Sequence, residues 1–187
     1  MSGARQVKVL YDENTIAQRT SEMAQEIAAA KPKDLLVVAI LKGSFMFAAD
    51  LLRALYRVGL EPHVEFIHLS SYLEGTVSSG TVRILKDIES SVKERDVLLI
   101  DDILESGRTL AFAKDLLVAR GARRVMICTM LEKPGKRAVQ LNADFVGFVC
   151  PDVFVVGYGM DVAHSYRELP FIGRVVTGDQ AELAQSA

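Results

Sequence analysis

The sequence has little of what marks secreted, membrane-spanning or nucleic-acid-binding proteins. Its 187 residues include two cysteines, Cys128 and Cys150, and both lie in apolar runs, which is typical of core residues in a reducing compartment. No stretch has the pattern of a signal peptide, a transit peptide or a membrane span. The 22 basic and 24 acidic residues leave a formal charge of −2, so charge gives no support for nucleic-acid binding. We therefore expect a cytoplasmic enzyme with no nucleic-acid or membrane partner.

Two common nucleotide-binding motifs are also missing. There is no G-x-x-x-x-G-K-[ST] loop, and Gly157-Tyr158-Gly159 is a lone G-x-G without the third glycine of a dinucleotide fingerprint. The chain length suits one domain with room for a small subdomain. Half of the residues are hydrophobic (50%), which is enough for a core that covers both faces of a sheet.

The stretch from residue 97 to 110 organises the rest of the chain. Val97–Ile100 is an apolar run of the kind found in buried strands of parallel sheets. Asp101 and Asp102 follow where we expect that strand to end. A small-residue turn then leads into residues 110–120, whose apolar spacing is helical. The predicted order is strand, acidic pair, turn and helix.

This order has a chemical consequence. A turn that opens a helix presents unpaired backbone N–H groups and a partial positive charge, to which the Ser106 and Thr109 hydroxyls add donors. Such a turn suits a phosphate group. The two carboxylates would repel a phosphate, but they suit sugar hydroxyls and Mg²⁺. The stretch therefore predicts a ligand with a phosphate, a vicinal diol and a metal.

The remaining patterns predict an α/β fold with a mainly parallel twisted sheet and helices on both of its faces. The site should lie beyond the carboxyl ends of the strands. We expect a single domain, 1–187, with a core from about 30 to 150 and a small hood from about 1–15 and 150–176. The expected helices are 14–30, with Asp12 or Asn14 as cap, 45–56 and 110–120; the further strands are 35–41, 64–69, 82–85, 124–131 and two adjacent strands, 144–149 and 153–158; residues 70–80 are expected to form a loop, and the tail from Thr177 to be frayed.

Residues 97–110 resemble the phosphoribosyl-pyrophosphate (PRPP) signature of the type I phosphoribosyltransferases, with four apolar residues, two acids and then acid-Ser-Gly-x-Thr-Leu. Three further motifs follow the order found in the hypoxanthine and hypoxanthine–guanine members, and the resemblance runs from about residue 7 to 176. These motifs are Ala39-Ile40-Leu41-Lys42-Gly43-Ser44-Phe45, Glu132-Lys133-Pro134, and Phe154-Val155-Val156-Gly157-Tyr158 with Asp161 and Tyr166-Arg167-Glu168-Leu169.

The resemblance implies transfer of phosphoribose from PRPP to hypoxanthine, and also to guanine, giving IMP or GMP and pyrophosphate. It implies roles for named residues, and it implies Mg²⁺ as cofactor. Ser106, Gly107, Arg108 and Thr109 would bind the 5′-phosphate; Asp101 and Asp102 the ribose diol; Lys42, Gly43 and Arg167 the pyrophosphate, at a turn that in the family often contains a cis peptide; and Asp101, Asp102 and Asp161 the metal.

The purine site and a lid are implied in the same way. Lys133 would donate to the purine 6-oxo group, Phe154 would stack on the base, and the backbone of Val155 would read the ring edge. Ser71 and Tyr72 match the start of a loop that closes over the site in the family. Shielding makes chemical sense, because water would otherwise hydrolyse PRPP.

Glu105 is the expected general base at purine N7, and it departs from the family, in which most members have aspartate. Asp101 also departs, since glutamate is frequent at that position. A second interpretation is that Glu105 only shapes the turn. Rival functions are a xanthine- or adenine-specific transferase, although Lys133 and Phe154 argue against adenine, a PRPP-fold regulator that binds nucleic acid, and an inactive homologue. The resemblance also implies a homodimer or homotetramer.

Overall fold

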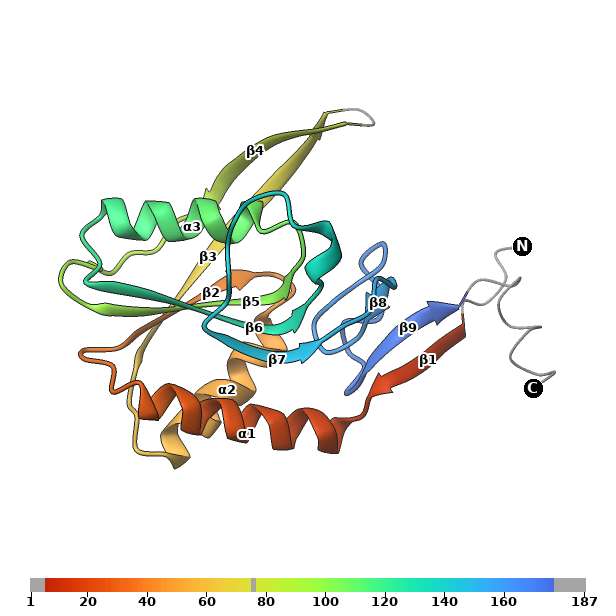
Figure 1. The fold of residues 1–187 in the computed structure, drawn as a ribbon, viewed down its shortest axis with the longest axis horizontal. Coiled ribbons are helices and arrows are strands. Elements are labelled where there is room, and N and C mark those ends of the chain that lie inside the picture. The colour runs from red at the N-terminus through yellow and green to blue at the C-terminus, as the bar shows by residue number, and fades with distance from the viewer. Residues whose placement is uncertain (1–5, 75–76, 177–187) are drawn as a thin grey trace.

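Two sheets make up the described part of the chain (Figure 1). A computed structural model describes residues 6–74 and 77–176, and for residues 71–81 it describes the backbone alone. The larger sheet has the strand order β4-β3-β2-β5-β6-β7, and the smaller has the order β1-β9-β8. The elements are β1 (Gln6–Tyr11), α1 (Glu13–Ala29), β2 (Leu36–Leu41), α2 (Phe45–Arg57), β3 (His63–Glu74), β4 (Val77–Lys86), β5 (Asp96–Leu104), α3 (Arg108–Ala119), β6 (Arg124–Glu132), a 3-10 turn (Pro134–Lys136), β7 (Phe145–Val149), β8 (Val155–Val156) and β9 (Ile172–Val176).

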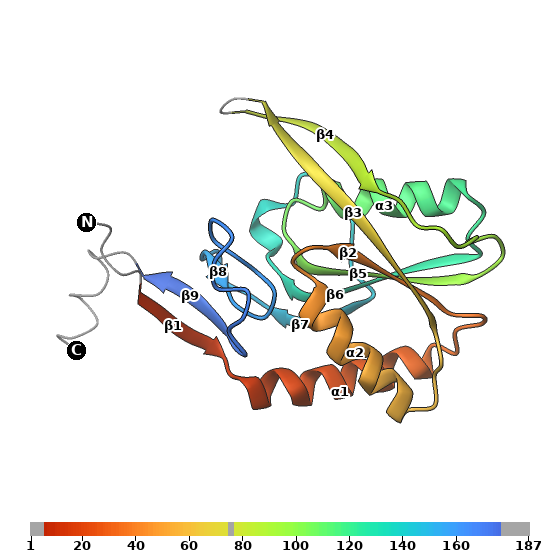
Figure 2. The same cartoon turned by 180° about the vertical axis from the view of Figure 1, so that it is seen from behind.

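The larger sheet is mainly parallel and has helices on both faces, as the sequence predicts. Strands β3, β2, β5, β6 and β7 run parallel, and only β4 pairs antiparallel to its neighbour. Helix α3 lies on one face, and α1 and α2 lie on the other (Figures 1 and 2). The Asp12 side chain caps α1 by accepting a hydrogen bond from the Thr15 N–H at 2.8 Å.

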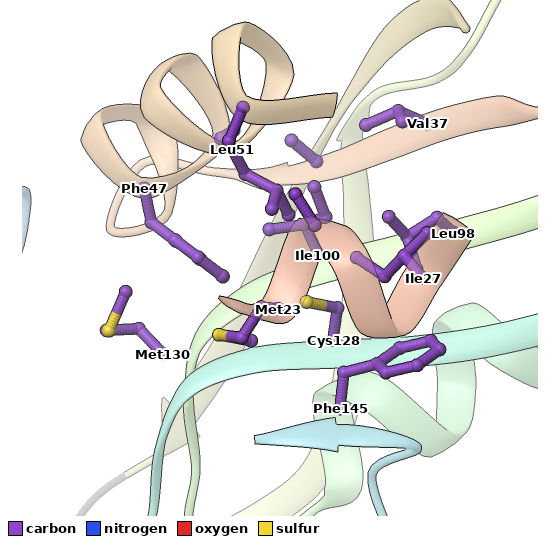
Figure 3. Close-up of a cluster of buried hydrophobic side chains, with 14 of the residues drawn as sticks. Met23, Ile27, Val37, Phe47, Leu51, Leu98, Ile100, Cys128, Met130 and Phe145 are labelled. Atoms are coloured by element: carbon purple, nitrogen blue, oxygen red, sulfur yellow. The ribbon is translucent and has the colours of Figure 1, made fainter. Parts of the chain in front are cut away.

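The face beneath α1 and α2 carries the larger hydrophobic cluster (Figure 3). Met23 and Ile27 of α1 and Leu51 of α2 point onto the strands, where alternate residues such as Leu98 face them. A second cluster fills the space between the sheet and α3. Both cysteines are free and buried, as predicted, and burial raises the pKa of the Cys128 thiol. Within residues 6–74 and 77–176, no helix is both long enough and apolar enough to span a bilayer.

The smaller sheet joins the two ends of the described chain. Strand β1 pairs antiparallel with β9, and β9 pairs antiparallel with β8. The two short strands expected at 144–149 and 153–158 are present as β7 and the shorter β8, but they do not form a hairpin, because β7 pairs with β6 and β8 pairs with β9 in the other sheet. Pro151 lies in the connection, where it cannot donate a ladder hydrogen bond. Strand β9 was not predicted from the sequence.

Two further strands are longer than expected. Residues 70–80 were expected to form a loop, but β3 continues to Glu74 and β4 begins at Val77, so both strands project beyond the sheet as a ribbon (Figures 1 and 2). Backbone pairing, for example Ser71 opposite Val82, needs no apolar side chains. The side chains of Ser71 and Tyr72 and the tail from Thr177 lie outside the described residues. Strand β5 likewise runs past the acidic pair to Leu104.

Candidate active site

The site forms where the order of the larger sheet reverses. From β2 the chain goes to β3 on one side and later returns to β5 on the other. The crevice beyond the carboxyl ends at such a point is where open α/β sheets bind ligands. Here the turn after β2 carries Gly43, and the end of β5 carries Asp102. A Cβ atom on Gly43 would lie 1.8 Å from Asp102 Oδ2, so only glycine lets the two segments approach this closely.

The acidic pair lies in the second half of β5, where Asp101 is buried and Asp102 is half-buried. Asp101 Oδ1 accepts a hydrogen bond from the Asp102 N–H at 3.0 Å, and Asp102 Oδ1 accepts one from the Ile103 N–H at 2.8 Å. Burial and the adjacent charge of Asp102 raise the pKa of Asp101 well above its usual range. Burial also raises the pKa of Asp102, although Arg167 opposes that shift. Two adjacent acids in these surroundings favour a cationic or hydroxyl-rich ligand.

The turn between β5 and α3 has the geometry of an anion site. Gly107 has a positive φ of +81° and precedes the first residue of α3, so its conformation suits glycine. The Ser106 hydroxyl accepts from the Arg108 N–H at 3.4 Å, while Thr109 lies half-buried in the first helical turn. The backbone N–H groups at this helix start and the Ser106 and Thr109 hydroxyls can therefore serve a phosphate.

The segment after the 3-10 turn braces this anion site, which sequence reasoning missed. Arg137 donates from Nη1 to the Glu105 carbonyl at 2.8 Å and from Nη2 to the Glu132 carboxylate at 2.5 Å. The Ala138 N–H donates to the Ser106 carbonyl at 2.9 Å. The only signal in the sequence was the basic run after Lys133, which looks like ordinary surface.

A cavity of about 380 Å³ opens beside the turn, and the predicted purine residues line it. The buried Lys133 side chain donates from Nζ to the Val153 carbonyl at 2.8 Å. Phe154 is 58% exposed, so its ring is available for a flat ligand, and Val155 lies next to it in β8. Asp102 lines the same cavity.

Glu105 also lines the cavity, close to two ammonium groups. Its Oε1 lies 3.6 Å from Lys133 Nζ and 3.8 Å from Lys136 Nζ. Lys136 pairs with Asp152 at 2.7 Å, and both residues line the cavity although sequence reasoning did not select them. The Glu105 carboxylate is therefore turned toward this cavity, and its backbone belongs to the turn between β5 and α3.

The loop between β8 and β9 brings Asp161 and Arg167 to the same place. Arg167 donates from Nη1 to the Gly159 carbonyl at 2.6 Å, and its Nη2 lies 2.6 Å from Asp161 Oδ1. A Cβ atom on Gly159 would lie 2.2 Å from the Gly43 carbonyl, so the loop rests directly on the turn after β2. That turn contains a cis peptide between Leu41 and Lys42.

The residues present fit a Mg²⁺ ion that shares its ligands with a substrate. Asp102 and Asp161 line one cavity and offer hard oxygen ligands. Across residues 6–74 and 77–176, no three His, Cys, Asp or Glu side chains gather as a metal cage. Mg²⁺ ordinarily uses one or two carboxylates together with substrate phosphates, which is the donor set available here.

Not every predicted site residue lines the cavity. Asp102, Glu105, Lys133, Phe154, Val155 and Asp161 do so. Residues 106–109, Lys42, Gly43 and Arg167 lie around it at the turns described above. The Lys42 side chain is exposed. The assigned roles of all these residues remain predictions, as does the lid.

The fold and this arrangement define a phosphoribosyltransferase, and comparisons with known proteins agree. The family model for the phosphoribosyl transferase domain matches residues 6–163. The chain belongs to this family of transferases.

Three relatives illustrate the similarity. The chain is 40% identical to the hypoxanthine phosphoribosyltransferase of Escherichia coli K12, over 93% of this chain and 98% of that protein. It is 40% identical to the solved structure of a hypoxanthine-guanine phosphoribosyltransferase from Bacillus anthracis, with a TM-score of 0.85 over 91% of this chain and 100% of that one. It is also 47% identical, over 89% of its length, to the bifunctional protein TilS/HprT of Listeria innocua, of which it spans 25%.

Proposed function

We propose that the protein transfers phosphoribose from PRPP to hypoxanthine, and also to guanine, in purine salvage. The observation that supports this most is the meeting of three features at one cavity. These are a buried ammonium group at Lys133, an open aromatic face at Phe154 and an acidic pair next to an anion-binding turn. The similarity to named hypoxanthine phosphoribosyltransferases over nearly their whole length supports the same base.

The residues divide the substrate between them. The turn of residues 106–109 would hold the 5′-phosphate, and Asp101 and Asp102 would hold the ribose hydroxyls. Lys42, Gly43 and Arg167 would hold the pyrophosphate. In the reaction, the C1′–O bond to pyrophosphate breaks, the C1′–N9 bond forms, and the purine loses a proton that Glu105 would accept from N7.

A Mg²⁺ ion bound by Asp102 and Asp161, with Asp101 behind them, would neutralise charge on the departing pyrophosphate. Positively charged side chains would assist the metal in neutralising the pyrophosphate. Arg167 presents a planar guanidinium that suits phosphate oxygens, and its bond to the Gly159 carbonyl orients it. Burial raises the pKa values of Asp101 and Asp102, and a bound cation would oppose that shift.

The purine pocket favours a 6-oxo base. The Lys133 ammonium group can donate to an oxo group and cannot accept from the amino group of adenine. Xanthine differs from hypoxanthine and guanine only at position 2 of the ring. In the xanthine-preferring alternative, backbone groups near Val155 would therefore decide which base binds best. We also propose that the protein acts in the cytoplasm and as a homodimer or homotetramer.

The direct test measures nucleotide formation from PRPP and Mg²⁺ with hypoxanthine, guanine, xanthine and adenine in turn. We expect the highest kcat/KM with hypoxanthine, a measurable rate with guanine and little with adenine. Asp102→Asn serves as the control, because it should abolish most PRPP use with all bases. Xanthine as the best substrate would support the alternative, and RNA binding without transfer would support the regulator.

A further inference from the structure

The buried hydroxyl of Tyr158 connects the loop that carries Asp161 and Arg167 to helix α2. Tyr158 is 6% exposed, and its hydroxyl donates to Asp50 Oδ2 at 2.8 Å. Asp50 Oδ1 accepts from Arg53 at 2.6 Å, so the carboxylate has a partner on each oxygen. These three residues line a second cavity, of about 420 Å³, beside α1 and α2. They therefore do not line the cavity that would hold the purine.

The loop is attached at the residues next to this hydroxyl. The Tyr158 N–H donates to the Leu169 carbonyl at 2.8 Å, and the Gly159 N–H donates to the Arg167 carbonyl at 3.0 Å. The Arg167 guanidinium also donates a hydrogen bond to the Gly159 carbonyl. Consequently, the position of the guanidinium follows the position of residues 158 and 159.

The second attachment is the turn that would bind pyrophosphate. Gly159 rests on the Gly43 carbonyl, and the same turn continues directly into α2, which begins at Phe45. Asp50 lies in the second turn of that helix. The loop therefore contacts the turn and helix α2 at two points, through Gly159 on Gly43 and through Tyr158 on Asp50. The Tyr158–Asp50 hydrogen bond joins residues 108 positions apart in the sequence.

We propose that Tyr158, through Asp50, is a positioning residue that fixes the 157–169 loop against the Leu41–Gly43 turn. In this role it sets the distance between Arg167 and the pyrophosphate subsite without touching substrate. The inference deepens the proposed function and rests on its assignment of the pyrophosphate subsite. A hydrogen bond outside the cavity can act there because misplacing a binding group by about 1 Å is enough to cost ~10²-fold in rate.

The purine contacts have anchors of their own. The Phe154 carbonyl accepts from the Val175 N–H at 3.0 Å, and Val155 pairs with Arg174 in β9. Lys133 directly follows β6, and its N–H donates to the Leu104 carbonyl at 3.0 Å. Loss of the Tyr158 hydroxyl should therefore weaken pyrophosphate binding and leave the base contacts intact. A purely structural role would not separate the two.

The experiment compares the full chain with Tyr158→Phe and Asp50→Asn. Calorimetry in Mg²⁺ gives the Kd for inorganic pyrophosphate, and initial rates give the KM for hypoxanthine. Tyr11→Phe is the matched control, because the Tyr11 hydroxyl, in β1 of the smaller sheet, donates to the Val149 carbonyl of β7 at 3.2 Å and the ring stacks on Phe148. For Tyr158→Phe we expect an about ten-fold weaker pyrophosphate Kd, the effect of losing a hydrogen bond to a charged acceptor. The KM for hypoxanthine should stay within two-fold.

Asp50→Asn should have a smaller effect in the same direction, because the amide oxygen still accepts from Tyr158. Adding Tyr158→Phe to Asp50→Asn should cost less than the sum of the two changes. An unchanged pyrophosphate Kd, additive effects, or equal losses for both ligands would overturn the positioning role. Failure of the proposed function would look different: the unmodified protein would bind pyrophosphate but form no IMP from hypoxanthine.

Discussion

Replacing Lys133 by methionine tests the base assignment with little change in shape. The Lys133 side chain is 8% exposed, and its stem is packed, so a methionine of similar length should fill the same space without a charge. An ammonium group has three donors, of which one is directed to the Val153 carbonyl at 2.8 Å. The others face Glu105 and the cavity. Loss of a charged hydrogen bond to the 6-oxo group costs about 1.5–3 kcal/mol, so the KM for hypoxanthine should rise by about 10- to 150-fold.

Lys136→Met is the matched control for that experiment. Lys136 carries the same charge near Glu105, but its side chain is 54% exposed and pairs with Asp152 at the surface. A solvent-exposed ion pair is worth about 0–1 kcal/mol, so we expect less than a five-fold change. The assay is IMP formation at saturating PRPP and Mg²⁺, with the KM for PRPP measured in parallel. Equal shifts in the two variants, or a change confined to PRPP, would refute the assignment of Lys133 to the base.

Three further predictions concern Glu105 in the turn before α3, Gly43 in the turn after β2, and Asp96 at the start of β5. Glu105→Gln should lower turnover by about 10²–10⁴-fold if Glu105 is the general base, with PRPP binding nearly intact; a loss below about ten-fold, measured where chemistry limits the rate, would favour the turn-shaping interpretation. Gly43→Ala should lower kcat/KM for PRPP by about 10²-fold because the new Cβ displaces the Asp102 carboxylate, whereas Gly135→Ala, which meets nothing within 4 Å, should not. Asp96→Asn should lower the free energy of unfolding by about 2 kcal/mol, less than a fully buried pair would, because its two arginine partners are 44% and 38% exposed. Burial opposes the ionisation of Asp96, but hydrogen bonds and the arginine charges hold its pKa below its usual range. The difference in free energy of unfolding between the unmodified protein and Asp96→Asn should therefore be present at pH 7 and shrink below about pH 4, as measured by urea titrations.

The sequence predicted the strands that are buried on both faces and failed where a strand is short or polar. Strands β2, β5 and β6 are continuous apolar runs, which a parallel sheet requires. Strand β9 has five residues and pairs with strands far away in the chain, so no local pattern marks it. The ribbon of β3 and β4 was read as a loop because its residues are polar. Backbone pairing alone extends it.

The same distinction applies to the site. The acidic pair and the phosphate turn were predictable because their chemistry depends on residues adjacent in the chain. Contacts between distant segments were not. Arg137 bonds to the carbonyl of Glu105, 32 positions away, and nothing in a basic residue after a strand indicates that partner. Tyr158 was noticed only as part of a family motif. No spacing pattern in the sequence indicates its hydrogen bond to Asp50.

The division of the site between two sheets has a consequence for ligand binding. The phosphate turn and the acidic pair belong to the larger sheet, where β5 is paired on both sides. Phe154, Asp161 and Arg167 belong to segments of the smaller sheet, which meets the first across contacts such as Gly159 on Gly43 and Lys133 on Val153. The proposed 5′-phosphate and ribose contacts would therefore form without the smaller sheet, whereas the proposed base and pyrophosphate contacts would depend on how the two sheets meet. Changes in β8 or β9 should accordingly alter base binding, and changes in their connecting loop should alter pyrophosphate binding, before either kind of change alters binding of the 5′-phosphate.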